Sequence, residues 1–353
     1  MYKEALLFET ISECVRCNIC EHHCIIRNNR RGVCGNYKNI NGKLYHIGYG
    51  KLSAVEVRPI EIKPFFHYWP NSLALTFSSW GCNFHCLWCQ NHHLSFRIPF
   101  EDDEYFHPEN LVNLAVSSGV EGLCASFNEP TVNFEYLLDV FSLGKNYGLY
   151  STVVTNGFQT LKAIEKLIEV GCDGWSIDIK GCPEVKGKAG VLGIIDHEII
   201  FRNAKYVLDL GGHVEMVYLI VTGFNDQCVE WIIDKHLEYL GPKTPLHINR
   251  YYPAFKWNKP ATSLSLLLEA RERAIKEGIE FVYVGNIHTT SYENTYCPNC
   301  GKLLIKRERY RITYFNLDKN GKGYRCPRCG YEIPIAGEYK PGRGLKNFFN
   351  IFL

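Results

Sequence analysis

The chain has 353 residues, 46% of them apolar, which is enough to bury the core of one barrel-sized domain with small appendages. Thirty-nine basic and 37 acidic residues leave a formal charge of +2, so we expect neither a membrane nor a nucleic-acid partner. The first residues lack the basic and apolar regions of a signal peptide, and no apolar run approaches the roughly 20 residues that cross a bilayer. We therefore expect a cytoplasmic protein.

Sixteen cysteines are distributed unevenly along the chain, and twelve of them fall into three tight groups. In a long chain from a reducing compartment, such groups predict metal sites more readily than disulfides. The other four cysteines are scattered singly, and we interpret them as small buried apolar residues: Cys124, Cys172, Cys182 and Cys228.

Between the outer cysteine groups, short apolar segments alternate with segments of helical periodicity. The predicted strands are 73–78, 122–127, 150–155, 175–179, 213–220, 245–249 and 280–284. The predicted helices are 108–118, 134–147, 161–170, 197–210 and 263–277, each followed by a glycine. About seven such units predict an α/β fold with a parallel sheet, closed as a barrel or partial barrel, with an open doubly wound sheet as the alternative.

The two ends of the chain lack this alternation. We therefore predict three units: a cysteine-rich metal-binding extension (1–69), an α/β core (70–290) and a metal-binding terminal module (291–353). We also predict that the apolar tail, 344–353, packs back onto the body. Within the core, polar residues at the carboxyl ends of parallel strands should converge on one face and form the functional site.

Cys82, Cys86 and Cys89 form a C-x-x-x-C-x-x-C motif directly after the first predicted strand. By itself this spacing fits zinc with a nearby histidine, a redox pair, or a 4Fe-4S cluster held by three cysteines with one open iron. The position after the first strand and the aromatic Trp88 before the last cysteine favour the cluster. There the motif resembles that of the radical S-adenosylmethionine (SAM) superfamily, which has a partial (β/α)6-type barrel and binds SAM at the open iron.

Further loops fit this resemblance. Asn128 and Glu129 lie in F-N-E-P, similar to the G-G-E-P motif of the superfamily, so Glu129 and neighbouring carbonyls are expected to receive the ammonium of SAM. Thr155 and Asn156 lie in T-N-G, which resembles the branch containing pyruvate formate-lyase activating enzyme. These polar groups, with Trp88, are expected to line the SAM site.

The D-x-K motif of the same branch is represented by Asp178 and Lys180, which point the same way from a strand. They are expected either to bind the ribose and carboxylate of SAM or to form an ion pair that serves only the fold. His247, which ends the sixth predicted strand, is a candidate contact on the adenine side, with a packed histidine as the alternative. The 220–223 segment is expected to line the adenine pocket.

The terminal cysteines lie in two C-P-x-C-G knuckles that fill a four-cysteine tetrahedral site in the manner of a zinc ribbon. Zinc is the default metal, and a rubredoxin-like iron is the alternative. The basic segment between the knuckles, 303–315, is predicted as an exposed strand. The ligands are Cys297, Cys300, Cys326 and Cys329.

The first cysteine group offers four thiols for one site, Cys17, Cys20, Cys24 and Cys34. Cys14, His22 and His23 are possible substitutes as ligands. Either a structural zinc or an auxiliary iron-sulfur cluster is compatible with this pattern.

The order of all these motifs resembles the AmmeMemoRadiSam-system radical SAM proteins, which are related to pyruvate formate-lyase activating enzymes. The matching segments include the first cysteine group with G-V-C-G, P-I-E-I-K-P at 59–64, N-E-P-T, T-N-G-F and D-I-K-G. The resemblance implies SAM cleavage by a 4Fe-4S cluster that receives one electron from an external donor, and a protein substrate or partner. The alternative is a non-catalytic redox or zinc-ribbon binding protein.

Overall fold

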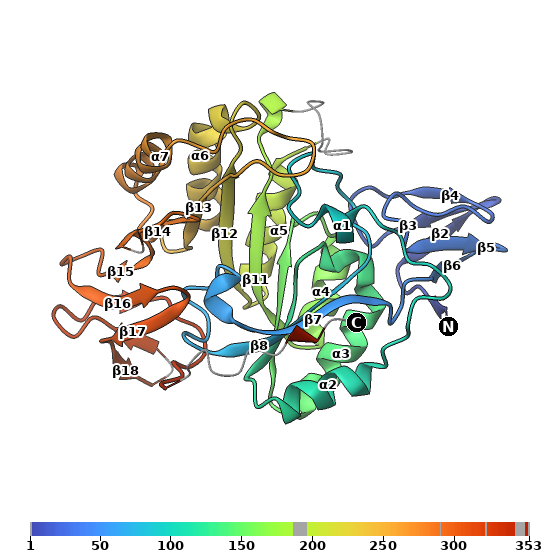
Figure 1. Ribbon diagram of the computed structural model, residues 1–353, viewed down its shortest axis with the longest axis horizontal. Helices are drawn as coiled ribbons and strands as arrows, with labels where there is room; N and C mark the ends of the chain where they lie inside the picture. Colours follow the sequence, from blue (N-terminus) through green and yellow to red (C-terminus); the bar gives the residue numbers. More distant parts are fainter. Residues whose placement is uncertain (1, 186–195, 290, 322, 343–349, 352–353) are drawn as a thin grey trace.

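The computed structural model describes residues 2–185, 196–289, 291–321, 323–342 and 350–351. Its centre is a nine-stranded sheet in the order β14-β13-β12-β11-β10-β9-β8-β7-β21 (Figure 1). Strands β8 to β14 are parallel, whereas β7 and β21 are antiparallel additions at one edge. Within the described part of the chain the two edges do not pair, so the sheet is a partial barrel and the predicted α/β fold is confirmed.

All seven predicted core strands are present, with ends shifted by at most three residues. They are β8 (Leu73–Ser79), β9 (Gly122–Ala125), β10 (Tyr150–Thr155), β11 (Cys172–Ile179), β12 (His213–Ile220), β13 (Leu246–Arg250) and β14 (Val282–Gly285). Alternate side chains face opposite ways: Leu75 and Leu123 pack toward the helices, while Ala74 and Cys124 face the barrel interior.

The five predicted helices are also present, and the structure adds α6, which the sequence analysis missed. The helices are α2 (Pro108–Ser117), α3 (Phe134–Asn146), α4 (Leu161–Glu169), α5 (Glu198–Asp209), α6 (Val229–Leu240) and α7 (Leu264–Glu277), with a short α1 (His92–Ser95) after the central cysteines. Each predicted glycine stop has a positive φ, as at Gly278, where φ is 115° and the N–H bonds the carbonyls of Ala274 and Ile275. No helix in the described ranges is both long and apolar enough to span a bilayer.

The N-terminal segment forms two small sheets beside the barrel, at the blue end of the ribbon in Figure 1. The first contains β2 (Phe8–Ile11), β3 (Cys14–Cys17) and β4 (Ile25–Arg27), and the second contains β1 (Lys3–Glu4), β6 (Lys43–His46) and β5 (Tyr37–Ile40). The next strand, β7 (Leu52–Pro59), pairs with β8. Part of the predicted extension is therefore a strand of the central sheet.

The terminal module lies at the opposite side of the barrel (Figure 1). One sheet contains β15 (Thr295–Tyr296), β16 (Leu303–Glu308) and β17 (Arg311–Phe315), and another contains β18 (Asp318–Asn320), β19 (Gly323–Arg325) and β20 (Glu332–Ile333). The single exposed strand predicted over 303–315 is wrong: the segment is a hairpin, and Leu304 and Ile305 are buried. In the tail, β21 (Asn350–Ile351) pairs with β7, so this part of the tail lies against the body as predicted; 343–349 and 352–353 lie outside the described residues.

The four scattered cysteines are all fully buried, as predicted. Two of them are not isolated, however, because Cys182 and Cys228 form a disulfide between the loops that follow β11 and β12. The two residues are 46 positions apart, and only the folded sheet brings their loops together. The interpretation of this pair as simple apolar residues is therefore wrong.

The amino end of the barrel is closed by the segment after β7, where Phe65 and Tyr68 pack against Ala74 and Tyr150. Glu215 on β12 holds this segment in place. Its carboxylate accepts hydrogen bonds from the backbone N–H groups of Phe66 (3.0 Å) and His67 (2.7 Å).

Two histidines complete the environment of Glu215: His247 Nε2 lies 2.7 Å and His213 Nε2 lies 3.1 Å from its oxygens. Burial alone would raise the pKa of Glu215, but the bonds from both histidines hold it well below its ordinary value. His247 is the second residue of β13 rather than its last, and it is buried, so the structure agrees with the alternative of a packed histidine and not with a contact on the adenine side. We therefore assign it no ligand contact.

We predict that Glu215→Gln lowers the free energy of unfolding by about 3 kcal/mol at neutral pH, because an amide cannot replace a buried carboxylate that accepts four hydrogen bonds. Since the folded pKa of Glu215 is depressed, its contribution is present above the unfolded value of about 4.3 and is lost as the pH falls toward the folded pKa. Anaerobic thermal unfolding from pH 3 to 8 measures both effects. Exposed Glu269→Gln is the control, and an equal effect of both substitutions would contradict the prediction.

Candidate functional site

The central cysteines lie at the carboxyl end of the parallel sheet, in the loop that follows β8. Phe84 N donates to Cys82 Sγ at 3.3 Å, and Cys89 Sγ lies 3.6 Å from Ser95 Oγ. Burial raises the pKa of Cys82 well above its ordinary value and that of Cys86 to about 12. Thiolates in this setting need a compensating cation, and three cysteines with neighbouring donors fit a cluster bound through three of its irons.

Glu129 follows β9 and ties two strand-end loops together. Its Oε1 accepts hydrogen bonds from Thr131 N (3.1 Å), Thr131 Oγ1 (2.5 Å) and Thr155 Oγ1 (2.7 Å). Its Oε2 accepts one from Asn156 N (2.8 Å), and Gln159 Nε2 lies 3.5 Å from Oε1. Burial raises the pKa of Glu129, and these donors oppose the rise. The carboxylate predicted to receive the ammonium of a ligand is thus already bonded by the protein.

The predicted site residues next to Glu129 also connect loops. Asn156 Nδ2 donates to Asn83 Oδ1 at 2.7 Å, and Asn128 Nδ2 donates to Gly81 O at 2.6 Å. Both contacts reach the cysteine loop from different strand ends. Thr155, Asn156 and Asn128 therefore lie together beside the cysteines, as the sequence predicts for residues at this edge of the sheet.

Phe127 lies at the position of the first glycine of the G-G-E-P motif and has φ of 70°. This left-handed conformation is unfavourable for a phenylalanine by about 1–2 kcal/mol, which explains the glycine of the motif. Lys63 Nζ lies 4.0 Å from the centre of the Phe127 ring, and burial lowers the pKa of Lys63 to about 8. Lys63 is a site residue to which the sequence analysis gave no role. Its position in P-I-E-I-K-P was the available signal.

Asp178 and Lys180 form an ion pair at the carboxyl end of β11. Burial alone would lower the pKa of Lys180, but the charges of Asp178 and Cys86 outweigh it and raise the pKa. Burial raises the pKa of the Cys86 thiol, and the charge of Lys180 opposes part of that rise. Asp178 Oδ1 and Ser176 Oγ are buried with no hydrogen-bond partner in the described structure, so they fit a bound polar ligand such as a ribose.

Trp88, between Cys86 and Cys89, packs against the loop after β12. Its ring centre lies 4.3 Å from that of Phe224 and 6.4 Å from that of Trp257. Trp257 Nε1 donates to Thr222 O at 3.1 Å. The 220–223 segment predicted to line an adenine pocket therefore adjoins the cysteine loop through an aromatic cluster.

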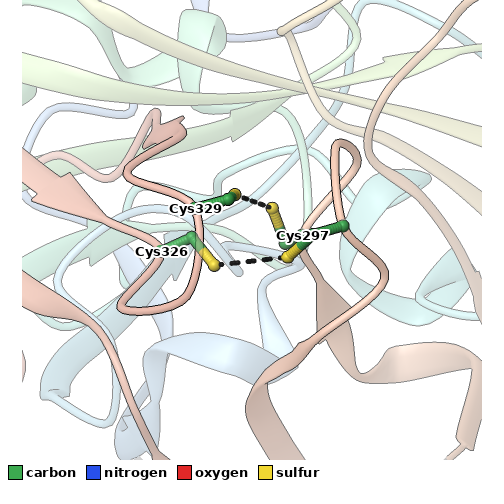
Figure 2. Close-up of side chains that lie close together, drawn as sticks. Cys297, Cys326 and Cys329 are labelled. Carbon is green, nitrogen blue, oxygen red and sulfur yellow. Dashed lines mark hydrogen bonds between the residues drawn. The ribbon is translucent and has the colours of Figure 1, made fainter.

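The terminal cysteines form a compact four-sulfur site. Cys297 Sγ lies 3.5 Å from Cys329 Sγ, Cys300 Sγ lies 3.6 Å from Cys326 Sγ, and all four sulfurs lie within 4.8 Å of one another. Figure 2 shows Cys297, Cys326 and Cys329 pointing their sulfurs toward one another from two loops. The backbone N–H of Tyr331 lowers the pKa of Cys329 to about 6. This arrangement fits a tetrahedral zinc or iron ion.

The first cysteine group lines a cavity instead of forming a compact four-sulfur site. Cys17, Cys20, Cys24 and Cys34 line one cavity with apolar neighbours such as Ile19. Cys14 does not line it. The four predicted ligands are therefore brought together, although more loosely than the terminal four.

Three comparisons place these features among known proteins. The family model of the radical SAM superfamily matches residues 78–235. An uncharacterized protein of Methanocaldococcus jannaschii is 37% identical over 343 residues, which is 95% of this chain and 99% of the relative.

Two solved structures are similar to part of this chain at low sequence identity. SuiB of Streptococcus suis bound to S-adenosylmethionine matches 65% of this chain and 55% of its own, with 16% identity and a TM-score of 0.48. A domain of pyruvate-formate lyase-activating enzyme from Bacteroides vulgatus matches 47% of this chain and 99% of its own, with 16% identity and a TM-score of 0.39. This chain spans about half the length of SuiB.

We predict that Glu129→Gln weakens SAM binding at least about tenfold while the cysteine loop keeps its iron, because the amide group would face donors on Thr155 and Asn156. Equilibrium binding of SAM to the anaerobically reconstituted protein measures the effect. Thr155→Ser, which keeps the hydroxyl donor, should bind SAM within about twofold of the wild type. Unchanged binding by Glu129→Gln would show that the carboxylate does not organise the site.

We predict that Cys326→Ser removes about one metal ion per chain and lowers the melting temperature, while iron at the central cysteines is retained. Elemental analysis and anaerobic thermal unfolding provide the measurements. Loss of iron instead of zinc would identify a rubredoxin-like ion. Retention of the ion in Cys326→Ser would contradict a four-cysteine site.

Proposed function

Because the chain belongs to the radical SAM superfamily and is a radical SAM enzyme, we propose that it removes a hydrogen atom from a protein substrate, as an activating-enzyme-like oxidoreductase. The observation that carries the SAM-binding part is that Cys82 lies near the Glu129 network and Cys86 lies near the Asp178–Lys180 pair. All of these groups lie at the carboxyl ends of the parallel strands, where ligands bind in such sheets.

The three thiolates are the ligands for a 4Fe-4S cluster, with one iron left open for SAM. When bound, this cluster supplies the electron that splits the sulfonium of SAM into methionine and a 5′-deoxyadenosyl radical. An external one-electron donor must deliver that electron. The protein orients the reactants and excludes water.

The surrounding residues have distinct parts in binding. Asp178 Oδ1 and Ser176 Oγ, both buried without a partner in the described chain, are acceptors for the hydroxyl groups of SAM. The carbonyls of the loop before Glu129 are acceptors for its ammonium, while Glu129 itself fixes that loop. Lys180, beside the cysteine sulfurs, offsets part of their negative charge.

A surface beside the cysteine loop supports a protein as the substrate. The ring of Phe255 stacks on His92 at 4.4 Å and lies 4.8 Å from the ring of Phe96. Phe255 and Phe96 are 36% and 37% exposed, so this aromatic rim is available to a polypeptide. The resemblance to AmmeMemoRadiSam-system proteins, associated with two other protein families, points the same way.

We predict that the anaerobically reconstituted protein with dithionite forms 5′-deoxyadenosine from SAM, and that Cys86→Ala abolishes the product. The reason is that two cysteines cannot hold the cluster with its open iron oriented. Chromatographic detection of 5′-deoxyadenosine is the measurement, and Cys172→Ala, a buried cysteine near the start of β11, should stay active. A wild-type protein that binds the cluster but never cleaves SAM would favour the non-catalytic metal-binding alternative.

The nature of the substrate is tested separately. Extract from cells grown in deuterated medium is divided into a protein fraction and a small-molecule filtrate, and each is added to the enzyme and SAM. We expect deuterium to enter 5′-deoxyadenosine from the protein fraction. Transfer from the filtrate alone would overturn the protein substrate and leave SAM cleavage intact.

A further inference from the structure

The segment that carries the first cysteine group is hydrogen-bonded to the side of the barrel. Thr160 N donates to Ile19 O at 3.1 Å and Glu21 N donates to Phe158 O at 3.0 Å. These bonds dock the Cys17–Cys24 turn onto the loop that carries the T-N-G motif. Glu21 also forms an ion pair with Arg202 on α5. The cavity between the four thiols therefore has a fixed position in the fold.

The spacing of these thiols distinguishes two kinds of metal site. Zinc with four thiolates at 2.3 Å places the sulfurs about 3.8 Å apart. Among the described residues, the terminal set is the one group whose ligand atoms all lie within 4.8 Å of one another. The first group does not meet that limit, and neither does the central triad, whose superfamily binds a cubane cluster. The wider spacing, around a cavity, fits a multi-iron cluster better than a single ion.

The other possible ligands of the first group have hydrogen bonds or strand pairings of their own, and of these only His22 also lines the cavity. His22 Nε2 lies 2.8 Å from Asn83 O, and His23 Nδ1 lies 3.0 Å from Asn18 Oδ1. Cys14 belongs to β3, pairs with Ile11, and does not line the cavity. The ligand set is thus four cysteines, which complete the coordination of a 4Fe-4S cluster and leave no open iron.

The cavity is directly adjacent to the loop of the central triad. Asn83, the residue after Cys82, lines the cavity. Gly81, the residue before Cys82, has φ of 90°, and a Cβ there would lie 2.6 Å from Cys34 O. Asn36 Nδ2 donates to Trp80 O at 2.8 Å and to Cys34 O at 3.2 Å. Backbone from the two cysteine groups is therefore in contact.

We propose that Cys17, Cys20, Cys24 and Cys34 bind a second 4Fe-4S cluster, next to the SAM-cleaving one, instead of zinc. This proposal does not depend on which substrate the enzyme uses, because the metal content of the site is measured without any turnover.

The test uses the full chain with Cys82→Ala, Cys86→Ala and Cys89→Ala combined, reconstituted anaerobically with iron and sulfide. We expect about four iron atoms and about one zinc ion per chain, against about eight iron atoms and one zinc in the wild type. The EPR signal of the reduced triple variant should not change on addition of SAM, because a cluster with four cysteine ligands has no open iron.

The matched controls vary the first group itself. Adding Cys20→Ala to the triple variant should remove the remaining iron, whereas adding Cys14→Ser should not. The ion at the four terminal cysteines, retained in every variant, reports that the chain is folded. A triple variant with about two zinc ions and no iron would overturn the second cluster. So would an EPR signal that SAM alters, because it would require an open iron.

Discussion

The site depends on one buried carboxylate, that of Glu129. A carboxylate removed from water costs several kcal/mol unless donors surround it, and here two threonine hydroxyls and two backbone N–H groups do so. Since the donors come from the loops after β9 and β10, the same bonds fix both loops relative to each other. Asn156 also donates a hydrogen bond to Asn83, which fixes the cysteine loop to the same two loops. Three strand ends are thus held as one rigid surface.

The opposite end of the barrel is sealed by a second buried ionic centre. Glu215 holds the chain at Phe66, and Arg307 of the terminal module donates to Phe66 O at 2.7 Å and to Thr295 Oγ1 at 2.9 Å. Arg307 is 1% exposed, and these carbonyl and hydroxyl oxygens and the Phe66 ring offset part of the cost of burying its charge. The terminal module therefore stabilises the closed end of the barrel, while the ligands approach the other end.

The predictions that succeeded rest on local signals. Strand and helix periodicity located seven strands and five helices, because burial of alternate faces leaves its pattern in the sequence. Cysteine spacing located the three groups, since the ligands of each lie close in sequence or in paired knuckles. Two failures are local, the missed helix α6 and the hairpin over 303–315. The others are long-range: the Cys182–Cys228 disulfide, the position of His247 beside Glu215, and the role of Lys63. In each long-range case the contact partners lie far apart in the sequence, so local spacing does not identify them.

By itself, the sequence determined the α/β fold class, the central cysteine motif and the superfamily resemblance. These follow from residue type and spacing along the chain. Only the tertiary structure decided which polar residues meet, because parallel strands that are far apart in the sequence become neighbours through hydrogen-bond register. It also decided that the sulfurs of the terminal group all lie within 4.8 Å of one another, whereas those of the first group do not. That difference depends on the distances between loops in the folded chain, and the spacing of cysteines along the sequence does not determine those distances.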